Sequence, residues 1–170
     1  MKLMKLLILL MTASLYCSCG TIMEALKRPL QEPEIVKKDS MEKYKYVYVA
    51  PTQGVASSLG GVYGGDYGVY GSTVGKSLNP CDIISGELIK KGYILLPAIK
   101  EETKAETLIA NYGETGRYGR GMGGGYTIEV TIQFISADSH KLVCICTAEG
   151  QGQTEADDIR IAIQRALSKL

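Results

Sequence analysis

The chain has 170 residues and a formal charge of +1, with 20 glycines, 11 tyrosines, one phenylalanine and no tryptophan. This length suffices for one domain with a buried core. The near-neutral charge argues against a nucleic-acid binder, which normally carries a basic face. Tyrosine combines apolar bulk with a polar tip, which suits wet surfaces and half-buried sheets.

Residues 1–18 have the pattern of an export signal. Lys2 and Lys5 give a positive start, and an apolar run from Leu6 to Met11 follows. A bilayer-spanning helix needs about 20 apolar residues. The sequence therefore predicts a removed signal peptide and not a transmembrane helix.

Cys19 is the expected site of lipid attachment. Lipoprotein signals, which this leader resembles, place an acylated cysteine first in the mature chain after a small residue, and Ser18 is small whereas Tyr16 precedes Cys17. An ordinary cleavage near Ser18, or an uncleaved tether, remains open. Lipidation would hold the protein to a bacterial membrane, for which we expect the outer membrane, with the leaflet undetermined.

The mature chain divides into a tether and a domain. Removing Lys2 and Lys5 changes the formal charge from +1 to −1. Residues 19–43 are polar, with Pro29 and Pro33 interrupting any long helix, and are expected to form a tether. Residues 44–170 are expected to form one α/β domain.

The first part of this domain combines a strand, a glycine-rich loop and a helix. Residues 44–51 alternate as a strand does. Residues 53–77 contain eight glycines and are expected to form a long loop without regular structure, because glycine loses much conformational entropy on ordering. Asn79 as N-cap, followed by proline, predicts a helix over residues 80–91, and a short strand is expected at 93–97.

The second part is richer in strands. A strand is expected over residues 107–112, and a second glycine-rich loop over 113–125. Alternation predicts strands over 126–136 and 142–149, joined as an antiparallel hairpin. Thr154 can cap a final amphipathic helix over 155–170.

These elements predict an α/β (α+β) fold. Its centre is a single five-stranded mixed sheet packed by two amphipathic helices, with two long Gly-rich loops.

Four stretches of the sequence resemble small lipoproteins common in Bacteroides and its relatives, which carry a domain of unknown function. They are IISGELIKKGY, TLIANYGETG, YTIEVTIQFISA and CTAEGQGQTEADDIRIAIQRAL. More distantly, the order of elements is similar to the TolB amino-terminal type of α/β domain in envelope lipoproteins. The resemblance implies an envelope protein and supplies no catalytic residues, because fold does not fix function.

Tyrosines and arginines within the glycine-rich stretches are the candidate contact residues. Tyrosine–glycine segments suit recognition, because tyrosine loses little side-chain entropy per area buried. Arginines beside a tyrosine could contact an anionic group or a glycan, although solvated charges are the simpler interpretation. The candidates are Tyr63, Tyr67, Tyr70, Arg117, Tyr118 and Arg120.

No complete catalytic or metal-binding set is present in the sequence. His140 is the single histidine, and Cys144-x-Cys146 lacks the second pair that a zinc site needs. We expect no cofactor, no metal and no enzymatic activity. Two cysteines two apart on a strand are poorly placed to bond with each other, so a bridge from Cys81 to one of them, or three buried thiols, are the alternatives.

The sequence thus favours a non-enzymatic envelope lipoprotein with a binding or assembly role through its Gly/Tyr-rich segments. Expected partners are the membrane, through the N-terminal lipid, and an envelope protein or glycan; the oligomeric state is open. The alternative is a small-ligand-binding or hydrolytic domain with a pocket between the two glycine-rich segments. That alternative requires convergence of Asp66, Glu114, Arg117 and Tyr118.

Overall fold

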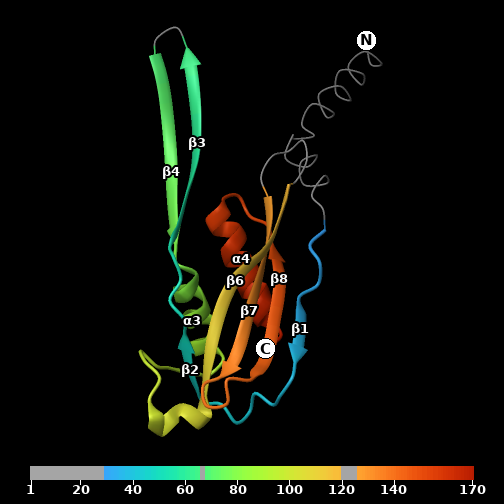
Figure 1. The fold of residues 1–170 in the computed structure, drawn as a ribbon. Helices are drawn as coiled ribbons and strands as arrows, with labels where there is room; N and C mark the ends of the chain where they lie inside the picture. Colours follow the sequence, from blue (N-terminus) through green and yellow to red (C-terminus); the bar gives the residue numbers. More distant parts are fainter. Residues whose placement is uncertain (1–28, 66–67, 120–125) are drawn as a thin grey trace, which may run out of the picture. The chain divides into compact units, whose positions relative to one another are not determined.

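A computed structural model describes residues 29–65, 68–119 and 126–170 (Figure 1). The protein is a mixed α/β structure with one large sheet, a separate two-stranded sheet and few helices. The large sheet has six strands in the order β1 (Glu34–Lys37), β8 (Leu142–Gly150), β7 (Tyr126–Ser136), β6 (Thr107–Gly119), β2 (Tyr46–Val49) and β5 (Ile94–Leu95). The pairs of β2 with β5 and β6 are parallel and the others are antiparallel.

The sixth strand corrects the prediction of five. β1 lies within residues 19–43, which the sequence predicts as tether, and it pairs antiparallel with β8 at the sheet edge (Figure 1). Ile35 pairs with Cys146 and packs against the core. Only four residues with two apolar side chains form this strand, so its local periodicity is too short to mark it. The folded part of the chain therefore starts before residue 44.

The hairpin of β7 and β8 is confirmed, with Ile132 opposite Cys146 and Phe134 opposite Cys144. Strand β6 is longer than predicted and runs on to Gly119, through half of the stretch expected to be a loop. Its extension pairs with β7 across an irregularity between Glu114 and Gly116. The hydrogen bonds of that ladder offset the entropy that the glycines lose. Residues 120–125 lie outside the described chain.

The first glycine-rich stretch is also a correction. Instead of a loop, it forms two strands, β3 (Val55–Gly65) and β4 (Gly68–Leu78), which pair in unbroken antiparallel register. We call this two-stranded sheet the ribbon (green in Figure 1). Each strand supplies the other with the ladder hydrogen bonds that a glycine-rich chain lacks when alone.

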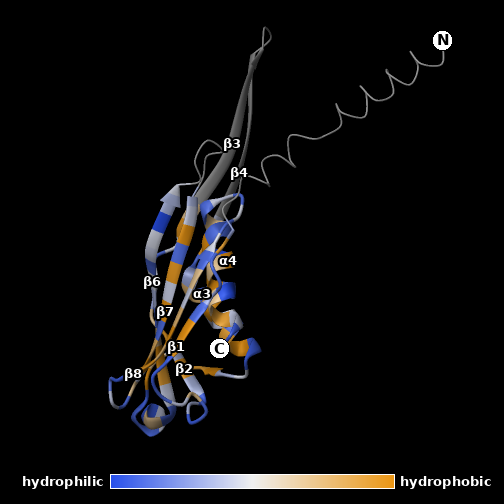
Figure 2. Ribbon diagram, turned by 90° about the vertical axis from the view of Figure 1, so that its right-hand side faces the viewer, coloured by the Kyte–Doolittle hydropathy of each residue, from blue (hydrophilic) through white to orange (hydrophobic). Residues whose placement is uncertain are grey.

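Both predicted helices are present. Asn79 caps α3 (Pro80–Lys90), where its side chain accepts a hydrogen bond from the Cys81 amide, and Thr154 caps α4 (Glu155–Ser168) in the same way through the Asp157 amide. A short 3₁₀ helix, η1 (Glu101–Glu106), precedes β6. In Figure 2, α3 and α4 lie on one face of the six-stranded sheet.

The core lies between that face and the two helices. Its largest fully buried side chains include Ile84 and Leu88 of α3, Phe134 of β7, and Ile159 and Ile163 of α4. Along β7, the alternate apolar residues from Ile128 to Phe134 are buried, whereas Tyr126 at the start of the strand is 52% exposed. Within the described residues, no helix is both long and apolar enough to cross a membrane.

Candidate functional site

The ribbon holds two of the six residues that the sequence marks for recognition. Tyr63 and Tyr70 are register partners, so the pairing of β3 with β4 brings these two candidates opposite each other. Tyr67 lies outside the described residues, as do Asp66 and Arg120. Each strand has 11 residues, which corresponds to a length of about 35 Å.

The ribbon has two long outer edges. Among the described residues, β3 and β4 are hydrogen-bonded only to each other, so each strand has one unpaired outer edge. The edge strands of the main sheet are short, with four residues in β1 and two in β5, although β6 continues from Asn111 to Gly119 beyond its pairing with β2. Short edge strands are a common way to prevent unwanted strand pairing, and a long open edge invites it.

The ribbon joins the six-stranded sheet and its helices, which we call the body, through the pair Val55 and Leu78, which we call its root. Leu78, the last residue of β4, is 5% exposed, and its register partner Val55 packs against the core. Just before β3, the Thr52 hydroxyl donates to the Asn79 side chain at 2.6 Å and accepts from the Cys81 amide at 3.0 Å. The cap of α3 therefore also positions the two ends of the ribbon.

A groove of about 440 Å³ lies beside this root, between the start of β3 and the middle of β6. The Tyr112 hydroxyl donates to the Glu114 carboxylate at 3.3 Å. Burial, followed by the negative charge of Glu114, raises the pKa of Tyr112 well above its usual range. The lining residues are Pro51, Thr52, Gln53, Gly54, Val55, Pro80, Tyr112, Gly113 and Glu114.

Arg117 is paired within the protein. Its guanidinium donates to Glu155 at 2.6 Å and to Glu114 at 3.2 Å, and it lies 5.6 Å from the centre of the Tyr126 ring. The hydrogen bond to Glu155, and then that to Glu114, raise the pKa of Arg117. With two carboxylates around one guanidinium, the cluster has a net formal charge of −1. It ties β6 to the start of α4 and is poorly suited to bind an anion.

The structure brings two residues of the predicted pocket set into contact. Glu114 and Arg117 meet, and the Tyr118 ring lies over Gly116, where an added Cβ would come within 2.7 Å of the Tyr118 hydroxyl. Asp66 lies outside the described residues, so the required convergence of four residues stays a prediction.

The segment entering the domain from the N-terminal side is clamped at the far end of β8. The Arg165 guanidinium donates to the carbonyl oxygens of Glu149, at 2.5 Å, and Gln31, at 2.7 Å. The Gln31 amide donates to the Glu149 carboxylate at 2.9 Å, and Lys169 pairs with Glu32 at 3.3 Å. Sequence reasoning missed this clamp, because it joins residues that are more than a hundred positions apart.

The cysteines in the described chain are free thiols. Cys144 and Cys146 are fully buried, with their sulfur atoms 3.8 Å apart, and Cys81 is half-buried. Burial raises the pKa of Cys146, so its thiol stays protonated and unreactive at neutral pH. Nowhere in residues 29–65, 68–119 and 126–170 do three histidine, cysteine or carboxylate side chains cluster as metal ligands would.

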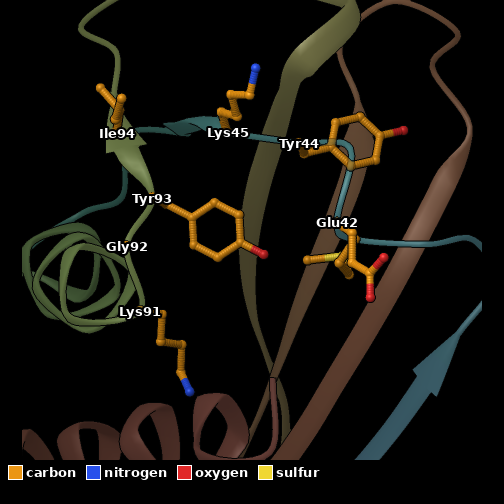
Figure 3. Close-up of a pocket in the computed structure, with 8 residues that line it drawn as sticks. Glu42, Tyr44, Lys45, Lys91, Gly92, Tyr93 and Ile94 are labelled. Atoms are coloured by element: carbon orange, nitrogen blue, oxygen red, sulfur yellow. The ribbon is translucent and has the colours of Figure 1, made fainter.

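Another hollow of about 450 Å³ lies at the opposite end of β2 from the ribbon and is shown in Figure 3. The Tyr93 ring lies across its middle, between Lys91 and Glu42. Burial raises the pKa of Tyr93. Lys45 at the rim is paired with Glu106 at 3.0 Å. This hollow is open and lacks a convergent set of polar groups, so it makes a weaker candidate than the ribbon.

No protein-family model matches the chain, and no curated protein matches it. Among solved structures, two crystal forms of the PelC dodecamer from Paraburkholderia phytofirmans are similar in fold. One, a single-residue variant, is 14% identical over 80% of this chain and 93% of its own, with a TM-score of 0.48. The other is 17% identical over 82% and 98%, with a TM-score of 0.48 as well. At this level the likeness carries no conclusion about function.

Proposed function

We propose that this protein is a non-enzymatic envelope protein, anchored by a lipid at Cys19, which recognises its partner with the ribbon. One observation carries the proposal: among the described residues, two 11-residue strands pair only with each other, so each has an unpaired outer edge along its length. Strand edges of this kind bind extended chains through main-chain hydrogen bonds, so no deep pocket is required.

The clamp at Gln31 supports the anchoring part of the proposal. Gln31 is held by Arg165 and Glu149, and it lies twelve positions after Cys19 in the sequence. Twelve residue steps span at most about 40 Å when the chain is fully extended. An acylated Cys19 would therefore keep the domain close to the membrane surface, with the ribbon within reach of other envelope components.

Site-specific photo-crosslinking in intact cells tests the recognition part. A photoreactive amino acid replaces Tyr63 or Tyr70 on the ribbon, and Gln133, an exposed residue of β7, serves as the matched control. We expect covalent adducts from the two ribbon positions and few from Gln133. Adducts that form equally at all three positions, or at none, would contradict a recognition role for the ribbon.

Fractionation tests the anchor. The Cys19→Ala variant is expected to leave the membrane fraction, whereas Cys17→Ala is the matched control and is expected to stay. Retention of Cys19→Ala in membranes would refute lipidation at that residue.

The groove beside the ribbon root favours one alternative, binding of a small ligand next to Tyr112 and Glu114. Three of its polar side chains already have partners: Glu114 accepts from Tyr112 and Arg117, and Thr52 is bonded to the α3 cap. A ligand would have to compete with these bonds. Thermal-shift screening with Glu114→Gln as a comparison would establish this alternative if a compound stabilised only the unmodified protein.

A further inference from the structure

The backbone of the ribbon specifies which amides are available to a partner. The ladder ends at Gly65 and Gly68, with only two residues between them, so this last pair is hydrogen-bonded. Bonded and non-bonded pairs then alternate along an antiparallel ladder. Val62 with Gly71, and Gly60 with Thr73, are therefore non-bonded pairs. The amide of Val62 faces outward from β3, and that of Thr73 faces outward from β4.

The two outer edges are matched. β3 and β4 have the same length, 11 residues, and run antiparallel without a register shift. If β4 of one copy pairs with β3 of the next, the new pair is again antiparallel and equally long. The same step repeated around a closed ring leaves no edge unpaired, because a head-to-tail contact uses both edges of every copy.

Other possible partners would leave one edge of the ribbon unpaired. A single extended peptide from a different protein covers one edge only. Two copies joined through the same strand cover one edge each and leave the other exposed. A lone two-stranded sheet is marginally stable at best in water, and this one contains seven glycines within its strands. The edges also carry little charge to repel a strand, since Lys76 is the one charged residue within the sequences of β3 and β4.

We propose that the partner of the ribbon is a second copy of this chain, joined head to tail through the outer edges of β3 and β4. This inference rests on the proposed function, because it names the partner for the same surface. The number of copies follows from the angle between neighbours, which the single chain does not define.

Edge-specific proline variants test the proposal. Proline removes one amide donor, and at a non-bonded position it leaves the internal ladder intact. Val62→Pro blocks the β3 edge and Thr73→Pro blocks the β4 edge; Val62→Thr and Thr73→Val keep the amides and are the matched controls. The molar mass of the full-length protein, extracted in detergent, is measured by analytical ultracentrifugation.

We expect wild type and both control variants to sediment as oligomers, and each proline variant as a single chain. An equimolar mixture of the two proline variants should form dimers and nothing larger, because each retains the edge that the other lacks. Three results would overturn the proposal: a wild type that is a single chain at every concentration, a proline variant that still assembles, or a mixture that stays monomeric. Circular dichroism identifies a variant that has failed to fold; Gly60→Pro and Gly71→Pro then replace it, since they block the same two edges.

Failure here is distinguishable from failure of the proposed function. A monomeric wild type that still gives adducts to other proteins from Tyr63 and Tyr70 would overturn self-association and leave the recognition role standing. A monomeric wild type without any ribbon adducts would overturn both.

Discussion

The six-stranded sheet and the ribbon are built from the same kind of antiparallel ladder but are stabilised differently. In the sheet, β7 and β8 pack against α4, and the edge strands β1 and β5 have four and two residues. In the ribbon, Val55 and Leu78 at the root join the core, and among the described residues the two 11-residue strands pair only with each other. We propose that the sheet is stable within one chain, whereas the ribbon pairs with another.

The largest effect is expected from a change in the body, at Gly150. A Cβ there would collide with the backbone of α4 at Asp158 and lie 2.5 Å from the Ala162 amide nitrogen. Gly150→Ala should therefore lower the free energy of unfolding by about 2 kcal/mol, as overpacking does. Urea denaturation measures the loss. Gly113→Ala is the control, since a Cβ there meets nothing within 4 Å; equal losses for both variants would contradict the close packing.

A smaller effect is expected at the clamp. Arg165→Ala removes two charge-assisted hydrogen bonds to the carbonyls of Gln31 and Glu149. The cost should be about 1.5 kcal/mol in urea denaturation, with faster proteolysis near residue 31. Arg160→Ala is the matched control, because Arg160 is exposed and its pairing with Asp157 is long, at 3.6 Å, and contributes little. Unchanged proteolysis in Arg165→Ala would show that the clamp does not hold the incoming segment.

Removing the ribbon should cost the body still less. Replacing residues 57–76 with Asn-Gly keeps Val55 and Leu78 in the core and closes a short hairpin. We expect the free energy of unfolding of the monomer to change by less than about 1 kcal/mol, because Val55 and Leu78, which join the core, are retained. If the shortened protein no longer unfolds cooperatively, the six-stranded sheet and its helices depend on the ribbon for stability, which would contradict this prediction.

The smallest effect concerns alkaline pH. Burial raises the pKa of Tyr112 in the folded state above its ordinary value of 10.0, so the hydroxyl stays neutral while the unfolded chain ionises. The stability from this group is complete below about pH 10 and is lost progressively as pH rises towards the folded pKa. We therefore expect the free energy of unfolding, measured by urea denaturation, to fall less between about pH 9 and pH 11 in Tyr112→Phe than in wild type. Parallel losses in the two proteins would show that Tyr112 ionises normally.

Local sequence signals predicted the body well and the ribbon badly. The alternation from Tyr126 to Ser136 and the caps Asn79 and Thr154 each act within a few residues, so β7, α3 and α4 could be predicted. The ribbon depends on pairing between β3 and β4, and its glycines mask the strand pattern. The edge strand β1 is similarly defined by its partner β8 and not by its own four residues.

For the candidate contact residues too, local sequence signals were informative, whereas contacts between distant residues could not be predicted. Tyrosine–glycine composition pointed to Tyr63 and Tyr70, which become register partners. Composition could not reveal that Arg117 pairs with Glu155, a residue 38 positions away, which turns a candidate anion contact into a link between β6 and α4.

Hydrogen–deuterium exchange of the ribbon amides tests most directly whether its edges are covered. In a dispersed single chain, the outward amides such as those of Val62 and Thr73 should exchange quickly while the inward ones are slower. In protein left in its native membrane, we expect slow exchange at both sets, because a neighbouring strand pairs with the outer edges. Equally fast exchange of the outward amides in membranes and in the dispersed chain would contradict it.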